Sequence, residues 1–383
     1  MNNDFLNLFS FTRKYYENYT KKISLHEPVF FGNEKKYVND AIDSTFVSSV
    51  GKYVDLFEKN FSEYTKSNKS VAVVNGTSAL QVCLRLCGVK SGDEVLTQSL
   101  TFIATANAIS YLNAKPIFLD VDIDTLGLSP KSLNDFLNEF GDKRQNGTFN
   151  KKTGKRIAAC MPMHTFGFIG RIDEIVTICD DWNIPVIEDS AEALGSKYKG
   201  KNAGSFGKMS AFSFNGNKII TTGGGGMIVT NSDKLGLEAK HITTTAKISH
   251  KWEYDHDNVG YNFRMPNINA AIGCAQLENI EKILHNKSLL HFEYQYLFSE
   301  IGIELVKPPK NNTWNYWLNC VKLNDRRERD LFLKESHKNG ILNRPVWKLL
   351  FKLDMYSSCQ KDSQKNSIFL EDRIVNIISS AKF

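Results

Sequence analysis

The sequence predicts an α/β protein with a large, mostly parallel sheet domain and a smaller α+β domain at the C-terminal end. From residue 71 to 245, short apolar runs alternate with helical patterns, as in a parallel sheet covered by helices. After about residue 250 the pattern becomes mainly helical. Since single cores stop growing at about 250–300 residues, 383 residues favour two parts. We expect an N-terminal leader over residues 1–25, a large domain over 26–250 and a small domain over 251–383.

The strands of the large domain are predicted from apolar runs bounded by glycine, proline, asparagine or aspartate. They are Val71–Val74, Glu94–Thr97, Pro116–Leu119, Ile157–Met161, Val186–Ile187, Met209–Phe214 and Met227–Thr230. Between two of these strands, Gly141–Arg156 is too polar for a core and is expected to be a mobile surface loop.

In the small domain, apolar periodicity predicts helices over Asn267–His285, Ser288–Ile301 and Asp325–Asn339, with a strand near Trp317–Val321. We expect the aromatic cluster Trp314–Trp317 to lie in the core of this domain. The residues from Asp354 onward are polar with short apolar runs, which predicts a loose terminal segment.

Composition excludes several classes of protein. The net charge of +6 comes without an arginine-rich tract and does not indicate nucleic-acid binding. Seven scattered cysteines without a CxxC pair argue against a disulfide framework, and no metal site is expected. Since the chain has neither a signal-like apolar segment nor a run long enough to span a membrane, we expect a cytoplasmic protein without membrane partners.

The first chemical signal is an apolar strand that runs through Asn75 and Gly76 into a helix beginning with Thr77 and Ser78. Gly76 permits close approach to the backbone, and the N–H groups and hydroxyls at a helix start can bind a phosphate. The pattern is neither a Walker loop nor GxGxxG, and it is also common as a plain helix cap. Both interpretations stay open from this segment alone.

The second signal is a buried strand that ends in Glu188 and Asp189. Consecutive strand residues face opposite sides, so the two carboxylates should have different roles. Asp189 is expected at the carboxyl edge of the sheet, where ligands of open α/β sheets bind, although an acidic helix cap is the alternative. His164 follows another strand and is a further candidate for ligand contact.

The third signal is Lys218, which precedes the glycine run Gly223–Gly226. A partly desolvated lysine amine is a nucleophile toward carbonyls, whereas most lysines are simply solvated. Together the three segments supply what pyridoxal phosphate requires, namely an amine, an anion for the pyridinium nitrogen and donors for the phosphate. Phe102, after the next strand, is placed to stack on the ring.

At these segments the chain resembles the DegT/DnrJ/EryC1/StrS sugar aminotransferases, pyridoxal-phosphate enzymes of the aspartate-aminotransferase fold, fold type I. The resemblance implies that Lys218 and Asp189 are catalytic, with Lys218 forming the Schiff base and Asp189 pairing with the pyridine nitrogen. It also implies that Thr77, Ser78 and Ser213 hold the phosphate. The segments that carry it are Phe46–Gly51 with Phe57 and Glu58, Asn75–Leu80, Thr101–Asn107, Glu188–Gly195, Phe212–Lys218 and Gly260–Met265.

The resemblance also implies a homodimer. In this family a motif like Asn262 and Arg264 is presented across the dimer interface, so Asn262 would complete the cofactor site of the other subunit. Arg344, Lys247 and Lys251 are unranked candidates for binding a substrate diphosphate.

Two positions depart from the commonest family pattern. Glu192 stands where many members have histidine or glutamine, and Gly224 where many have glutamate. Glu192 would put an acid near the cofactor's phenolic oxygen, so we expect it to be neutral or turned aside. With Pro28–Tyr37 and Ser48–Tyr53, these features look like the bacillosamine- or legionaminic-type branch. That branch transfers an amino group from glutamate to the C4 ketone of a UDP-linked 4-keto-6-deoxy-N-acetylhexosamine.

Three alternatives differ in what the sequence should contain. A sugar dehydratase on this fold would have histidine in place of Lys218. A non-catalytic regulator of the same fold would bind cofactor without turnover, and no DNA-binding extension is evident. A nicotinamide-dependent oxidoreductase should show GxGxxG after the first strand, and none is present there.

Overall fold

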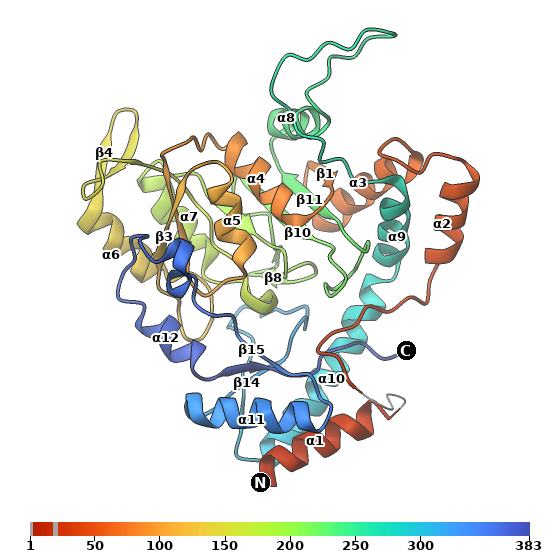
Figure 1. Ribbon diagram of the computed structural model, residues 1–383, viewed down its shortest axis with the longest axis vertical. Coiled ribbons are helices and arrows are strands. Elements are labelled where there is room, and N and C mark those ends of the chain that lie inside the picture. Colours follow the sequence, from red (N-terminus) through yellow and green to blue (C-terminus); the bar gives the residue numbers. More distant parts are fainter. Residues whose placement is uncertain (1–2, 18–21) are drawn as a thin grey trace.

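The computed structural model describes residues 3–17 and 22–383. Its main sheet is built from β1-β11-β10-β7 and β6-β2-β3, joined by a parallel bridge between Cys160 and Val186. All of these strands run parallel except β11, which is antiparallel to β1 and β10. The predicted mostly parallel sheet is therefore confirmed (Figure 1). The strands are β1 (Lys69–Val73), β2 (Glu94–Gln98), β3 (Lys115–Leu119), β6 (Arg156–Cys160), β7 (Ile187–Asp189), β10 (Met209–Ser213) and β11 (Gly226–Thr230).

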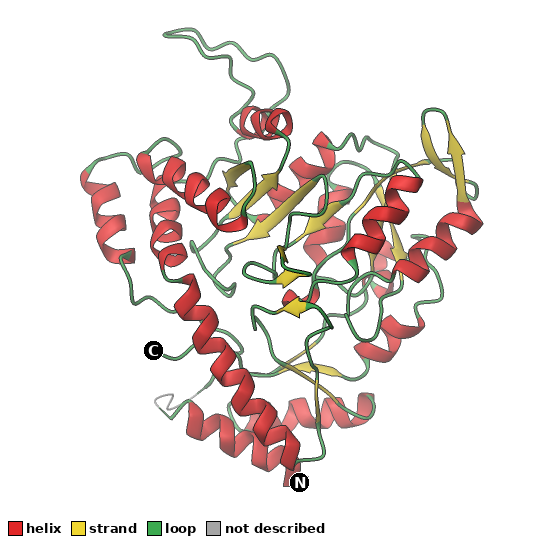
Figure 2. Ribbon diagram, turned by 180° about the vertical axis from the view of Figure 1, so that it is seen from behind, coloured by secondary structure: helices red, strands yellow, loops and turns green. Residues whose placement is uncertain are grey.

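Helices cover both faces of this sheet (Figures 1 and 2). In β1, Val71 and Val73 belong to one hydrophobic cluster and Ala72 to another, so successive side chains are buried on opposite faces. This burial on both faces explains why the strands read as continuous apolar runs. The helices are α3 (Lys52–Thr65), α4 (Gly76–Leu86), α5 (Ile103–Ser110), α6 (Pro130–Phe140), α7 (Ile172–Asp181) and α8 (Asp233–Thr243).

The segment predicted to be a mobile loop is instead an ordered hairpin, so that prediction is wrong. β4 (Gly141–Arg144) and β5 (Gly147–Asn150) pair antiparallel, and β5 continues onto β6. The buried Asn150 amide donates to Glu94 over 2.8 Å. Polarity misled here because a hairpin can satisfy its backbone hydrogen bonds on the sheet edge even when its side chains are mostly polar.

The C-terminal part has its own antiparallel sheet, in the order β12-β14-β16-β15. The helix predicted over residues 267–285 ends early, because the chain breaks at Asn279 between two helices. Its elements are α9 (Asn267–Glu278), α10 (Ile280–Glu300), β12 (Glu304–Leu305), β14 (Cys320–Lys322), α11 (Arg326–Lys338), β15 (Arg344–Pro345), α12 (Lys365–Glu371) and β16 (Ile374–Asn376). A further small sheet joins β13 (Asn312–Thr313), β8 (Lys197–Tyr198) and β9 (Lys201–Asn202).

The expectation of a loose segment from Asp354 onward is also wrong. β16 lies between β14 and β15, and Val375 and Ile378 are fully buried. A strand this short gives too few residues for its alternation to stand out in the sequence.

At the N-terminus, α1 (Asn3–Tyr15) packs against the C-terminal elements. The ring centroids of Phe5 and Phe9 lie 5.0 and 5.4 Å from that of Phe332 in α11. Residues 1–2 and 18–21 of the predicted leader lie outside the described residues. α9 packs on α2 (Glu34–Asp43) and α3. The division at residues 25 and 250 stays a prediction.

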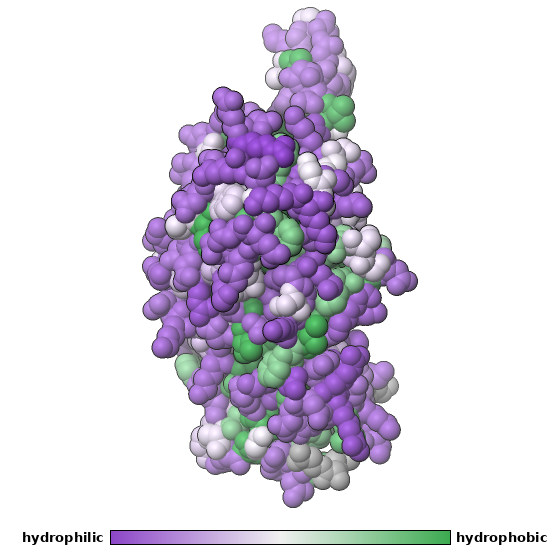
Figure 3. Space-filling model, turned by 90° about the vertical axis from the view of Figure 1, so that its left-hand side faces the viewer, coloured by the Kyte–Doolittle hydropathy of each residue, from purple (hydrophilic) through white to green (hydrophobic). Residues whose placement is uncertain are grey.

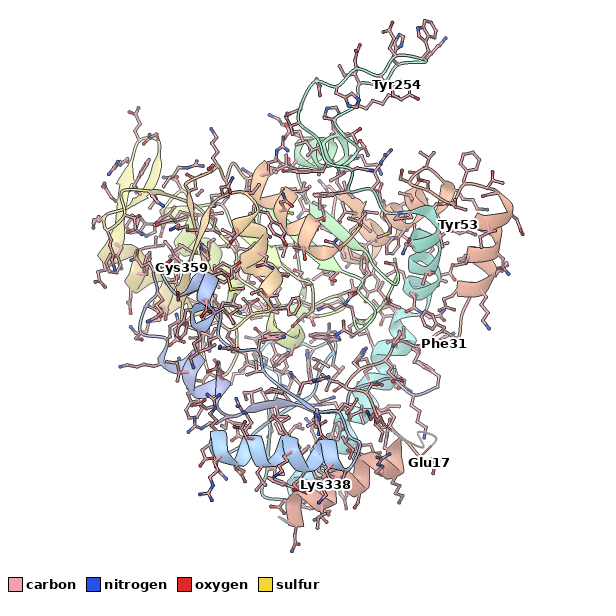
Figure 4. All side chains as sticks on the ribbon, viewed as in Figure 1. Glu17, Phe31, Tyr53, Tyr254, Lys338 and Cys359 are labelled. Carbon is pink, nitrogen blue, oxygen red and sulfur yellow. The ribbon has the colours of Figure 1, made fainter. Side chains whose placement is uncertain are left out.

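Residues 246–259 form a projecting arm, seen at the top of Figure 1 with Tyr254 labelled near its end in Figure 4. Trp252 and Tyr254 are 72% and 78% exposed. Elsewhere the face in Figure 3 is mostly hydrophilic with scattered apolar patches. No helix among residues 3–17 and 22–383 has the length and hydropathy to cross a membrane.

Candidate active site

A cavity of about 340 Å³ lies at the carboxyl ends of the central strands, where α/β proteins bind their ligands. Trp317 and Trp347 of the C-terminal part close it from the other side. The residues lining it are Asn75, Gly76, Thr77, Leu80, Phe102, Ala104, Met163, Asp189, Ala191, Glu192, Ser213, Asn215, Asn217, Lys218, Gly224, Gly225, Trp317 and Trp347. Segments far apart in the sequence, from residue 75 to 347, thus meet in one place.

Lys218 extends its amine into this cavity from the turn after β10. Its Nζ lies 3.3 Å from Glu192 Oε1 and 4.1 Å from the centroid of the Trp317 ring. Its side chain is 13% exposed, so the alternative of a solvated surface lysine does not apply.

Asp189 ends β7 and is buried at the cavity wall. Its Oδ2 accepts from the Thr105 hydroxyl over 2.8 Å, and its Oδ1 accepts from the Ala191 N–H over 3.2 Å. Burial raises the pKa of the Asp189 carboxyl, while these two hydrogen bonds and the charge of Lys218 act in the opposite direction. A buried acid held in this way can pair with a cationic ligand group.

Glu188 points to the opposite side of the strand and has a structural role. Its carboxylate accepts from the backbone N–H groups of Gly204, Phe206 and Gly207 over 2.7 to 2.9 Å. His164 Nε2 lies 2.9 Å from the same carboxylate and does not line the cavity. The two adjacent carboxylates therefore have different roles: Asp189 lines the cavity, and Glu188 binds backbone N–H groups. The structure does not support His164 as a ligand contact.

The start of α4 forms one wall of the cavity. Asn75 caps the helix, with its Oδ1 accepting from the Ser78 N–H over 2.8 Å. Thr77 and Ser213 line the cavity, whereas Ser78 is buried just behind it. A Cβ added to Gly76 would lie 2.9 Å from the Ser213 Cβ, so only glycine permits this close approach of helix and strand.

Phe102 lies at the mouth of the cavity and is half exposed. Its ring centroid is 6.4 Å from that of Trp347, and the two rings meet edge to face. Because Phe102 lines the cavity and is half exposed, part of its ring is accessible to a ligand there.

Glu192 faces the amine and is not turned aside. Its Oε2 accepts from the Phe166 N–H over 2.9 Å, while Oε1 points to Lys218. Burial raises the pKa of Glu192 to about 7, although the charge of Lys218 opposes the shift. The carboxyl is therefore poised to exchange its proton near neutral pH.

The pH dependence of stability should report this shift. Folding raises the pKa of Glu192 from its ordinary 4.5 to about 7, so in this window the folded chain holds a proton that the unfolded chain releases. Stability consequently falls as pH rises through the window. Glu192→Gln has no carboxyl to titrate and should not lose this stability. The free energy of unfolding of the variant minus that of wild type should therefore rise by up to about 3 kcal/mol as the pH is raised from about 4.5 to 8. Urea unfolding of the cofactor-free proteins measures it, and a pH-independent difference would contradict the assignment.

Besides Ser78 and His164, four sequence candidates lie outside this cavity. Asn262 is exposed, and its Oδ1 accepts from the Arg264 guanidinium over 3.1 to 3.2 Å. Lys247 and Lys251 lie on the projecting arm, and Arg344 is exposed in β15. None of the four lines the cavity of its own chain.

The sequence interpretation missed the two tryptophans of the cavity. Trp314 is core, as expected, but Trp317 lines the cavity while being only 3% exposed. Trp347, between Val346 and Lys348, belongs to no motif that would indicate ligand binding. Residue type and spacing carry no signal for either role, because the two side chains reach the site only through the packing of the C-terminal part on the sheet.

Comparison with known proteins places this site in a family. A model of the DegT/DnrJ/EryC1/StrS aminotransferase family matches residues 31–381. A putative pyridoxal phosphate-dependent aminotransferase, EpsN of Bacillus subtilis (strain 168), is 37% identical over 331 residues, 86% of this chain and 82% of that protein. A GDP-perosamine synthase of Escherichia coli O157:H7 is 37% identical over 337 residues, 88% of each chain.

Solved structures share the fold. Helicobacter pylori PseC, an aminotransferase involved in the biosynthesis of pseudoaminic acid, superposes with a TM-score of 0.84 at 24% identity, covering 93% of this chain and 94% of that chain. The predicted fold type I is thereby confirmed. The chain belongs to the DegT/DnrJ/EryC1/StrS aminotransferase family.

Proposed function

We propose that the chain is a pyridoxal-phosphate-dependent nucleotide-sugar aminotransferase whose active site is the cavity around Lys218. The observation that carries the proposal is the meeting of an amine, a buried carboxylate and a hydroxyl-bearing helix start in one cavity, through Lys218, Asp189 and Thr77. These groups match the aldehyde, the ring nitrogen and the phosphate of the cofactor. Gly76 lets β10 approach the start of α4 closely, which brings Ser213 beside the helix N–H groups that would bind the phosphate.

The cofactor, when bound, supplies an aldehyde and an electron sink. Lys218 would hold it covalently and, once displaced by glutamate, would move the proton at the substrate carbon with its Nζ. Asp189 would keep the ring nitrogen protonated, Thr77, Ser78 and Ser213 would bind the phosphate, and Phe102 would cover the ring. Glu192, next to Lys218, would take or return a proton of the amine.

We propose that the working form is a homodimer in which Asn262 completes the cofactor site of the second subunit. Support comes from the position of Asn262, which is exposed and outside the cavity of its own chain. The arm of residues 246–259, with Trp252 and Tyr254 exposed, leads directly to this segment. A second copy would cover those rings and receive the arm.

We further propose that the substrate is a UDP-linked 4-keto-6-deoxy-N-acetylhexosamine, aminated at C4 with glutamate as donor. The features that support it are Glu192, Gly224 and the segments 28–37 and 48–53, as described for the sequence. A GDP-linked keto sugar is the competing candidate, because a GDP-perosamine synthase is among the similar proteins. A dehydratase is disfavoured because a lysine, rather than a histidine, occupies the cavity.

The test is amination of purified 4-keto sugars with the holoenzyme and glutamate. We expect product formation from the UDP-linked 4-keto-6-deoxy-N-acetylhexosamine, with kcat/KM at least roughly 100-fold above that for a GDP-linked 4-keto-6-deoxyhexose, since a lost or mismatched buried polar contact costs a few kcal/mol. Mass spectrometry with ¹⁵N-glutamate follows the nitrogen into the sugar. The opposite preference would replace the UDP assignment, and transfer to neither sugar would overturn the proposed reaction.

A further inference from the structure

We propose that Trp317, a residue of the C-terminal part, is the positioning residue that holds the Lys218 amine in its reactive place. The inference rests on the proposed function, because it takes Lys218 to be the amine that binds the cofactor. Trp317 has no acid, base or nucleophile to offer, so its contribution is to restrict where the amine can go.

Trp317 makes two separate contacts with the turn that carries the amine. The face of its ring lies 4.1 Å from Lys218 Nζ, within the range of a cation–π interaction. Its indole N–H donates to the Asn217 carbonyl over 2.7 Å, one residue before the lysine. The same side chain therefore holds both the backbone of the turn and the end of the lysine side chain.

The position of Trp317 is itself defined by buried polar contacts. Its backbone N–H donates to Asn315 Oδ1 over 3.0 Å, and its carbonyl accepts from the buried Lys287 Nζ over 3.1 Å. Lys287 also donates to the Ser379 carbonyl. Lys287 belongs to α10, and Ser379 follows β16. The backbone of Trp317 is therefore fixed by the C-terminal part of the chain.

The same turn also holds the acid that faces the amine. Asn315 Nδ2 donates to the carbonyls of Glu192 and Leu194 over 2.7 and 2.9 Å. Trp317 and Asn315 thus fix the two sides of the Lys218–Glu192 pair from one short segment. Reacting groups must be held to within about 1 Å for efficient catalysis, which this double attachment provides.

A neighbouring tryptophan supplies the matched control. Trp314 lies in the same turn, is equally buried at 3%, and donates its indole N–H to the Phe166 carbonyl over 2.9 Å. Its ring packs on Phe168, His291 and Tyr316 and makes no contact with Lys218. Loss of Trp314 therefore tests the packing of the turn without removing the ring beside the amine.

The experiment measures how fast cofactor-free protein captures added pyridoxal phosphate, followed by the visible absorption band and its circular dichroism. Trp317→Leu should capture the cofactor at least roughly 10-fold more slowly than wild type and give a weaker dichroic band, because the amine is no longer oriented. Trp317→Phe retains the aromatic face but loses the indole hydrogen bond to the Asn217 carbonyl, so its rate should fall between those of wild type and Trp317→Leu. Trp314→Leu should stay within about threefold of wild type. If Trp317→Leu does not fold, as judged by far-ultraviolet dichroism, Trp317→Met takes its place.

The outcomes separate this inference from the proposed function. Wild-type capture at Lys218 with an equally fast Trp317→Leu would overturn the positioning role alone. Trp317→Phe as slow as Trp317→Leu would overturn the role of the ring face and leave the turn held only through the hydrogen bond to Asn217. A Trp314→Leu rate as low as that of Trp317→Leu would overturn the positioning role as well, since the effect would then belong to the turn. If wild type itself shows no band that depends on Lys218, the proposed function falls first.

Discussion

Lys218→Ala is expected to abolish the visible band of the cofactor-loaded protein and to lower amino transfer by at least roughly 10³-fold. The amine is both the covalent anchor and the group that moves the proton, and no other lysine lines the cavity in the described part of the chain. Borohydride reduction of wild type followed by peptide mass spectrometry should place the cofactor on Lys218. Glutamate should bleach the band in wild type and cause no such change in the variant.

The matched control is Lys208→Ala, which removes an exposed lysine outside this cavity and should leave the band and the rate within about twofold of wild type.

Lys218→Ala also tests the proposed homodimer. Mixing Lys218→Ala with Asn262→Ala subunits should restore activity, because one site of the mixed dimer then has both residues. Activity retained by Lys218→Ala alone would remove the basis of the proposed function.

Asp189→Asn should lower the rate of the glutamate half-reaction by roughly 10²- to 10³-fold, corresponding to about 3 to 4 kcal/mol. An amide cannot supply the negative charge that keeps the ring nitrogen protonated, so kcat should fall much more than the affinity for glutamate. Stopped-flow spectroscopy of the visible band measures this half-reaction.

Thr105→Val provides the graded comparison for Asp189. It removes the hydrogen bond of 2.8 Å to the Asp189 carboxylate and leaves the charge in place. Its cost should be nearer tenfold, as expected for one hydrogen bond to a charged group. A rate for Asp189→Asn within threefold of wild type would show that Asp189 does not serve the ring nitrogen.

The strands of the main sheet could be predicted because each is a continuous apolar run that is buried on both faces, as Val71–Val73 illustrates. The hairpin of β4 and β5 could not, since its stability comes from backbone pairing with β6 and not from apolar side chains. The same limit applies to β16, whose place between β14 and β15 depends on partners far away in the sequence.

In the site, the residues on the carboxyl ends of strands were found because the strand-to-helix turns carry them, as with Asp189 and Thr77. Lys218 was recognised through the glycine run that follows it. The proximity of Glu192 to Lys218, and the ring of Trp317 beside both, depend on how the C-terminal part packs on the sheet. No local pattern encodes that contact.

The pairing of β1 with β11 has a consequence for how the protein is made. Lys69 pairs with Thr230, and β11 is the last strand of the main sheet along the chain. During synthesis, the backbone of β1 therefore has no strand partner until β11 has left the ribosome. Such a high contact order slows folding and leaves an apolar strand edge exposed on the nascent chain. Co-translational folding of this domain should therefore complete late, with chaperone binding concentrated on nascent chains that end before residue 230.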